Sequence, residues 1–182
     1  MKFKNIIALA IPAFVSSTAF AQRGEVDTSY SCMYNVPQTA PNSRFDISED
    51  GASVLDLKTN LTWSRCDLGQ VWDNEIQQCQ GSALLVDWQV AHEKALIYSA
   101  SNKNEWRVPN IKELSSIIEE RCTRPAANIA VFPSIILGKT YISSTPYNFD
   151  STGESIFGMT TDLGYISHGS KSGAFSVKFV HN

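Results

Sequence analysis

The sequence has little charge and few side chains of the kind that bind metals. Of its 182 residues, 18% are charged and three are histidines, and acidic residues outnumber basic ones by 18 to 15. The lack of a basic excess argues against a nucleic-acid-binding protein. The cysteines form no C-x-x-C pair, and no histidine lies at ligand spacing, so no zinc site is predicted. The 43% of hydrophobic residues is enough for one compact domain and excludes wholesale disorder.

Motifs of covalent catalysis are also missing. The chain has no G-x-S-x-G string, the turn that exposes a nucleophilic serine. Residues 164–171 are superficially similar to a phosphate-binding loop, but the lysine is displaced by one position and no strand–loop–helix unit surrounds it. We therefore predict a protein that is not an enzyme and has no cofactor.

The hydrophobic run at the N-terminus is too short to cross a membrane. Lys2 and Lys4 precede an apolar run over residues 6–15, which the string A-F-A follows at residues 19–21. A bilayer needs ~20 apolar residues, and this pattern is typical of a secretory signal peptide. Loss of residues 1–21 leaves 161 residues, with 13 basic and 18 acidic side chains and a formal charge of −5. We expect an exported protein, periplasmic or extracellular, with no membrane span after signal cleavage.

All the cysteines lie in the part of the chain that we expect to be exported. In an oxidising compartment an even number of cysteines usually means disulfides, and four cysteines permit three pairings. We favour a local bridge between Cys66 and Cys79 and a long one between Cys32 and Cys122. Each is worth on the order of 3 to 4 kcal/mol if it is unstrained.

The first part of the exported chain divides into a strap and a set of strands. Residues 22–43 are polar, contain two prolines and predict an extended strap that Cys32 tethers. From Phe45 onward the apolar period is two, with turns at residues 50–51 and 59–60, which predicts three short antiparallel strands. The residues expected on their one buried face are Phe45, Ile47, Leu55, Leu57, Leu61 and Trp63. Residues 67–74 show no apolar period and predict a loop, with Trp72 as its anchor.

Helical spacing appears next. Asp87 is expected to cap a helix that has Gln89, Glu93 and Lys94 outside and His92 at a buried edge. Its inner stripe consists of Trp88, Ala91, Ala95 and Leu96.

A second helix has the stronger start signal. Pro109 sets its entry, and Asn110 with Glu113 three residues later makes a capping box. Apolar residues then recur at helical spacing as far as Cys122, and residues 119–121 are interpreted as a solvated helix end.

The last third of the chain is rich in loops and aromatic residues. Short strands are predicted at residues 141–147, 156–159, 165–166 and 175–179, the last with clean alternation of polar and apolar residues. Two helices set between two groups of antiparallel strands predict an α+β domain that disulfides staple.

Several strings occur together in a fixed order. They include D-L-K-T-N-L-T-W-S-R-C at residues 56–66, W-R-V-P-N-I-K-E-L at residues 106–114 and S-S-T-P-Y at residues 143–147. In order and spacing the region 44–182 resembles the Lcl C-terminal domain family, a former domain of unknown function named after the Legionella collagen-like adhesin. The W-R-x-P string followed by a helix is also similar to the C-type-lectin-like superfamily, which includes the formylglycine-generating enzymes.

The resemblance implies an exported binding or adhesion module of C-type-lectin-like α+β fold, because the named member is a surface adhesin associated with sulfated host glycans. A charge of −5 opposes the long-range attraction that a sulfated polyanion would need. We expect a glycan or a cell-surface or envelope protein as partner. One alternative is an envelope assembly subunit that binds only proteins. Another is an enzyme of the formylglycine-generating type, which would need a reactive thiol.

Two sets of candidate residues follow. The first is the structural motif, in which Trp106 packs in the core, Arg107 forms an ion pair beneath the helix start, and Asn110 and Glu113 cap the helix. Its members are Trp63, Trp88, Trp106, Arg107, Pro109, Asn110 and Glu113. The second is a binding face in the loop-rich C-terminal half, where flat aromatic rings and polar groups occur together, as in sugar or protein recognition. Its members are Tyr147, Asn148, Asp150, Tyr165, His168 and Lys171.

Overall fold

The computed structural model describes residues 31–182, so the predicted signal peptide and the first part of the predicted strap lie outside the described residues. The helices are α1 (Trp88–Asn102), α2 (Ile111–Ser116) and the 3-10 helix η1 (Asn42–Arg44). The strands are β1 (Ser31–Cys32), β2 (Phe45–Ile47), β3 (Ser53–Asp56), β4 (Leu61–Ser64), β5 (Val71–Asp73), β6 (Gln78–Gln80), β7 (Cys122–Thr123), β8 (Thr140–Pro146), β9 (Ser155–Thr160), β10 (Ile166–Ser170) and β11 (Val180–His181). Helices and antiparallel strands thus occur together, which confirms the α+β class.

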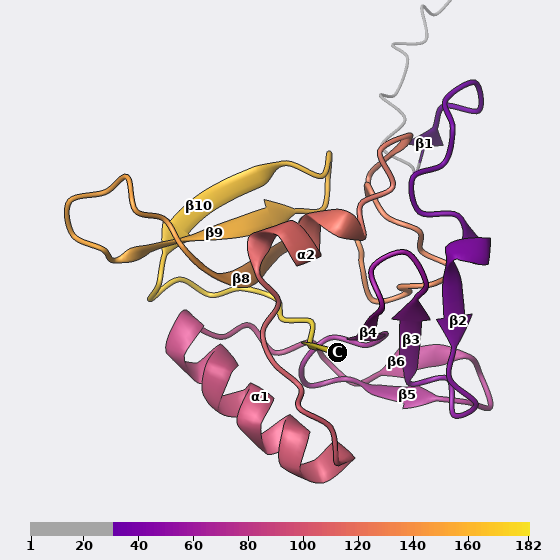
Figure 1. The fold of residues 1–182 in the computed structure, drawn as a ribbon, viewed down its shortest axis with the longest axis horizontal. Helices are drawn as coiled ribbons and strands as arrows, with labels where there is room; N and C mark the ends of the chain where they lie inside the picture. The colour runs from indigo at the N-terminus through magenta and orange to yellow at the C-terminus, as the bar shows by residue number, and fades with distance from the viewer. Residues whose placement is uncertain (1–30) are drawn as a thin grey trace, which may run out of the picture.

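Two antiparallel sheets form the frame of the molecule. One has the strand order β11-β4-β3-β2 and the other β10-β9-β8, and the pairs β1-β7 and β5-β6 stand apart from both. Figure 1 shows the β8–β10 sheet and α1 on one side and the β2–β4 sheet on the other, with the C-terminus between them. The segment that ends the chain therefore links the two sides.

The β8–β10 sheet lies between two hydrophobic cores. Tyr141 and Met159 pack with Trp63 in a core that α2 helps to form, whereas Ile142 and Ile156 pack in a second core against α1. In α1 only Ala91 and Ala95 are buried, and Leu96 is exposed although the sequence predicts it inside. Leu96 lies about 100° around the helix from Ala95, so a narrow contact stripe excludes it.

The three predicted strands after Phe45 are present, and Phe45 and Trp63 are buried as predicted, but the predicted buried face is wrong for β3 and for Ile47. Val54 and Asp56 are buried in β3, whereas Leu57 is exposed beyond the strand end, and Ile47 in β2 is also exposed. Asp56 points inward because the buried Arg44 guanidinium donates hydrogen bonds to both of its carboxylate oxygens. A buried ion pair, rather than apolar alternation, decides which side chains of β3 lie inside.

Both favoured disulfides are confirmed, Cys32–Cys122 and Cys66–Cys79. Cys32 and Cys122 face each other in the β1–β7 pair. Cys79 of the second bridge lies in β6. Strands β5 and β6 form a hairpin where the sequence predicts a loop. Trp72 of this hairpin stacks on the Arg65 guanidinium, 3.9 Å from it. It also covers Gly51, where an added Cβ would lie 2.2 Å from the Trp72 Nε1 atom.

The second helix is shorter than predicted. Asn110 and Glu113 form the capping box, but α2 ends at Ser116 and the chain turns toward β7. Glu119, which the sequence predicts on a solvated helix end, is only 1% exposed. Its carboxylate accepts hydrogen bonds from the backbone N–H groups of Thr39, at 3.1 Å, and Ala40, at 2.9 Å. The prediction is wrong because these N–H groups of the strap need a buried acceptor.

The last predicted strand is also wrong. Of the final residues only Val180–His181 form a strand, β11, and all residues from Ser176 to Val180 are buried. Lys178 is 1% exposed, and its Nζ atom lies 3.2 Å from Oδ1 of the buried Asp67 and 2.7 Å from Oγ of Ser134. A continuous buried run replaces the expected alternation because this lysine finds an acidic partner inside the protein.

Candidate functional site

The motif around Trp106 is built from groups that bind one another. Two guanidinium nitrogens of Arg107 donate to the two carboxylate oxygens of Glu113, each at 2.8 Å, and Glu113 also accepts from the Asn110 N–H at 2.8 Å. Burial alone would raise the pKa of Glu113, but the hydrogen bonds from Arg107 and Asn110 outweigh it and lower that pKa. Trp106 is buried, and its ring lies 5.2 Å from that of Tyr98. These contacts fix the start of α2 to the end of α1.

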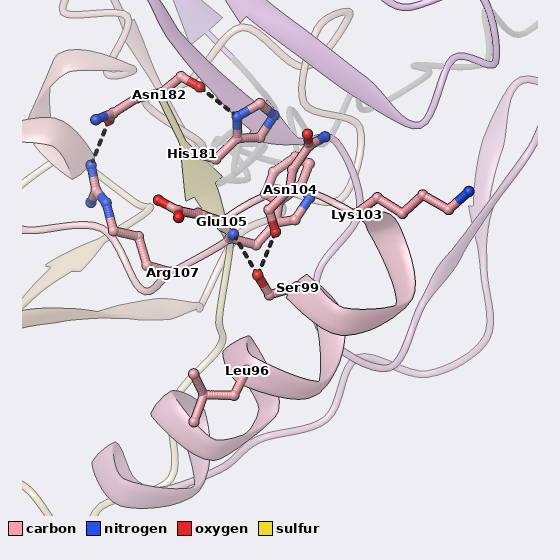
Figure 2. Close-up of a pocket in the computed structure, with 9 residues that line it drawn as sticks. Leu96, Ser99, Lys103, Asn104, Glu105, Arg107, His181 and Asn182 are labelled. Carbon is pink, nitrogen blue, oxygen red and sulfur yellow. Dashed lines mark hydrogen bonds between the residues drawn. The ribbon is translucent and has the colours of Figure 1, made fainter.

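A hollow of 590 Å³ lies beside this motif, at the C-terminal end of α1 (Figure 2). Most of its polar groups already have partners within the protein. Ser99 bonds to the carbonyl of Asn104, Arg107 donates to Oδ1 of Asn182 at 3.2 Å, and Nδ1 of His181 lies 2.7 Å from the Asn182 carbonyl oxygen. Figure 2 shows these bonds along the wall, with the Lys103 side chain directed away from it. The side chains of Ser99, Arg107 and His181 are therefore already engaged within the protein.

A cluster of aromatic rings lies near the end of the β8–β10 sheet where the 147–154 loop joins β8 to β9, and we call it the aromatic face. It consists of Tyr147, Phe149, Phe157 and His168. The Tyr147 and His168 rings are parallel, with centroids 4.2 Å apart and planes 8° apart. The Tyr147 ring also lies 5.1 Å from that of Phe157 and 5.4 Å from that of Phe149, which is 84% exposed.

Strand register explains why these rings meet. His168 of β10 stands opposite Phe157 of β9, so both side chains lie on the same face of the sheet. Tyr147 follows the end of β8, and its N–H donates to the Ser155 carbonyl at 2.9 Å. Because of this bond Tyr147 stands opposite Ser155, which lies two residues before Phe157 in β9. Aromatic side chains can reach each other across this diagonal.

The loop over residues 147–154 is held from within and by Lys171, which follows β10. Oδ1 of Asp150 accepts from the Gly153 N–H at 2.6 Å, and Nζ of Lys171 donates to the Gly153 carbonyl at 2.6 Å. The hydrogen bond from the Ser155 side chain and those from the loop outweigh desolvation and lower the pKa of Asp150. Asp150 and Lys171 thus shape the loop that presents Phe149.

Of the six residues predicted to bind a ligand, the structure brings two rings together, Tyr147 and His168. Asn148 is exposed beside them, while Asp150 and Lys171 hold the loop. Tyr165 lies at the opposite end of β10, because Ile166 pairs with Met159 and the chain then runs toward Ser155.

Two members of the aromatic face were missed in the sequence. Phe149 carried a usable signal, since it is a large aromatic residue inside a polar loop. Phe157 carried none, because it is one apolar residue among several in a predicted strand.

A second hollow, of 490 Å³, adjoins the same loop on the side of α1. Its walls are Asp87, Trp88, Gln89, Glu154, Lys171 and Ser172. The Lys171 ammonium lies 5.4 Å from the Trp88 ring, and the His92 ring lies 4.4 Å from the same Trp88 ring. Burial lowers the pKa of His92, which favours the neutral imidazole. Lys171 and Glu154 therefore connect this hollow to the loop of the aromatic face.

Residues 31–182 contain neither a metal-binding cluster nor a membrane-spanning helix. No three His, Cys, Asp or Glu side chains there gather closely enough to hold a metal ion. No helix in that part of the chain has the length and apolar character needed to cross a membrane.

Comparison with known families settles the relationship that the motifs suggest. A sequence profile of the Lcl C-terminal domain matches residues 52–181, which is most of the chain. The protein belongs to the Lcl C-terminal domain family. The matched Lcl domain contains the capping box and the whole aromatic face. No curated protein and no solved structure matches the chain, so the C-type-lectin-like architecture stays a prediction.

Proposed function

We propose that this Lcl domain is an exported, non-enzymatic ligand-binding module that binds a glycan on its aromatic face. The observation that carries the proposal is the parallel stack of Tyr147 and His168 beside the exposed ring of Phe149. Exposed aromatic clusters with a polar rim mark interaction sites. Flat rings offer the apolar faces of sugar rings a contact surface that costs little conformational entropy to order.

The electrostatic setting favours a neutral glycan over a sulfated one. After signal cleavage the chain carries a formal charge of −5. Around the aromatic face, the Lys171 ammonium already donates a hydrogen bond to the Gly153 carbonyl oxygen, and Asn148 contributes a neutral amide. A polyanion would meet repulsion at long range and little cationic compensation at the surface.

Export is supported by the two disulfides, because such bridges persist in oxidising compartments. The adhesin-associated character of the family fits a place in the periplasm or outside the cell. A C-type-lectin-like fold with two helices between groups of strands would suit the same role.

A glycan array, probed with and without calcium, tests the proposal. We expect binding to a small set of neutral glycans that Tyr147→Ala abolishes. Tyr34→Ala is the matched control, because Tyr34 is an exposed aromatic residue on the strap, away from the aromatic face. Absence of signal on every glycan, with and without calcium, would remove the sugar hypothesis.

A second candidate is an envelope subunit that binds only proteins. Exposed apolar residues around the 129–137 segment favour it, because such patches mark protein interfaces. They are Ile129, Ile136 and Leu137, together with Leu85, which lines a pocket with Gly138. Pull-down from the native envelope distinguishes the two: substitution of Ile136 and Leu137 by serine would abolish specific capture in this case and leave glycan binding intact in the first.

The third hypothesis, an enzyme of the formylglycine-generating type, requires a reactive thiol. All four cysteines are in disulfides, and none is free. Alkylation without reductant gives the direct test, and modification of any cysteine would reopen this hypothesis.

A further inference from the structure

β10 is the outer strand of its sheet, and its outer edge has no partner among the residues that the structure describes. On the inner edge, the Tyr165 carbonyl accepts from the Thr160 N–H at 2.8 Å, and the Lys171 N–H donates to the Glu154 carbonyl at 2.7 Å. In an antiparallel ladder every second residue bonds to the same neighbour. The backbone N–H groups of Ile166, His168 and Ser170 therefore point outward.

In the two larger sheets of the described residues, the other edge strands are covered or guarded. At the opposite edge of the same sheet, the Ile142 N–H donates to the Ser176 carbonyl at 3.1 Å. In the other sheet, Arg107 and Val180 exchange two bonds of 2.9 Å at the edge of β11, and the short β2 carries the charged Asp46. β10 has five residues and contains neither a charged residue nor a proline, which are the usual devices against pairing.

We propose that β10 pairs with β10 of a second copy of this chain, antiparallel, with the two His168 residues facing each other on the twofold axis. In this register Ile166 stands opposite Ser170 of the second copy. The strands would exchange hydrogen bonds through outward-facing groups that now have no partner. The result is one continuous sheet made of β8, β9 and β10 from both copies.

The ends of the strand support a second copy as the occupant. The same register sets Tyr165 opposite Lys171 of the second copy. Both side chains lie on the α1 side of the sheet, because residues six apart share a face and Lys171 lies over Trp88. Tyr165 is 63% exposed, and a lysine opposite it provides an apolar stem and a cation for the ring. By symmetry this contact forms twice, and nowhere does the register oppose like charges.

This arrangement would bring two aromatic faces together. Each His168 belongs to the aromatic face of its own copy, so the two faces would meet across the axis. This consequence rests on the proposed function, whereas the strand pairing does not. A glycan with repeated units would then bind two sites at once and gain avidity.

Sedimentation or light scattering of the purified protein gives the first test. We expect wild type and His168→Ala to have twice the monomer mass, because alanine keeps the outward N–H. We expect His168→Pro to be a folded monomer, since proline removes only an N–H that β9 does not use. A monomeric wild type at high concentration would overturn the proposal, and so would a dimeric, folded His168→Pro.

Cysteine cross-linking tests the register. Facing residues of a hydrogen-bonded antiparallel pair have Cα atoms about 5.5 Å apart, within the range of a disulfide. We expect His168→Cys to give a reducible dimer on a non-reducing gel. Ile166→Cys alone should give none, because its own counterpart would lie about 13 Å away along the strand. Cross-linking of Ile166→Cys but not of His168→Cys would overturn the register. A monomeric wild type that still binds glycan would overturn the strand pairing and leave the proposed function untouched.

Discussion

The buried charges and the aromatic face show two opposite uses of side chains in one small protein. Asp56, Asp67 and Glu119 are acidic residues inside the molecule, and each is held by two or more hydrogen-bond donors. At the aromatic face, by contrast, the rings of Phe149 and His168 are exposed, and those of Tyr147 and Phe157 are only partly buried. The first group holds the strap, the sheets and the C-terminal segment together. The second is available for a ligand, and we expect its substitution to change binding rather than stability.

Asp67 has the most extensive of the buried networks. Its carboxylate contacts Lys178, at 3.2 Å, and Lys139, at 2.6 Å, and accepts bonds from the hydroxyls of Tyr141 and Ser134. Burial and the negative charge of Asp67 raise the pKa of Tyr141 well above its usual value. Such a cluster is stable only while it is complete, because one missing partner leaves a charge without compensation.

The largest effect is therefore expected from Asp67→Ala. The change leaves the fully buried ammonium of Lys178 without its acid, which should lower the free energy of unfolding by about 3 to 5 kcal/mol. Urea unfolding followed by tryptophan fluorescence measures it. Lys178→Met is the matched control and should cost less, because Asp67 keeps Lys139 and the Tyr141 hydroxyl. A greater loss from Lys178→Met than from Asp67→Ala would mean that packing, rather than charge, dominates here.

Glu119→Ala is expected to have the next largest effect. It removes the acceptor of the Thr39 and Ala40 N–H groups, and each buried donor left unsatisfied costs about 1 to 3 kcal/mol. The loss should appear in urea unfolding and as faster hydrogen exchange at these two amides. Glu119→Gln keeps one acceptor oxygen and should lose about half as much. Unchanged exchange in Glu119→Ala would show that the Cys32–Cys122 bridge alone holds the strap.

A smaller effect is expected from pH. Burial raises the pKa of Asp67, but the ammonium groups of Lys178 and Lys139 outweigh burial, and the net pKa is lowered. A carboxylate with a lowered folded-state pKa stabilises fully above its unfolded pKa of about 4, and this contribution is lost as the pH falls through the folded pKa. The stability difference between wild type and Asp67→Asn should therefore shrink below about pH 4. A difference that stays constant down to acid unfolding would contradict the assignment.

The two groups of residues also differ in how far the sequence predicts them. The capping box was predictable because its signal is local. The disulfides were predictable because an even number of cysteines in an exported chain usually forms bridges. Burial of Glu119 and Lys178 was not, since Glu119 binds Ala40 at a separation of 79 residues and Lys178 binds the Arg65 carbonyl at a separation of 113. The nearby sequence of each charged residue looks like that of a solvated one, and only the fold brings its partner close.

The sequence predicted the kinds of residue that form the aromatic face, but it missed Phe149 and Phe157 and included residues that lie elsewhere. Aromatic and polar residues in the C-terminal loops pointed to Tyr147 and His168, which stack. Tyr165 was grouped with them, but strand direction places it at the far end of β10. Register within a three-stranded sheet decides which rings meet, and a sequence with short strands and loops of uneven length does not specify it.

The smallest effect on stability is expected from Phe149→Ser, where the comparison between the two groups is sharpest. Phe149 is 84% exposed, so its loss should change the free energy of unfolding by no more than about 0.5 kcal/mol. If the aromatic face binds a glycan, the same change should weaken binding at least about tenfold, equivalent to about 1.4 kcal/mol. Tyr34→Ser is the matched control, since Tyr34 is 89% exposed on the strap, outside the aromatic face. Paired urea unfolding and glycan titration of both variants measure the two quantities. Equal loss of binding in both variants would show that general surface hydrophobicity, rather than this cluster, holds the ligand. A large loss of stability in Phe149→Ser would instead place that ring among the groups that hold the fold.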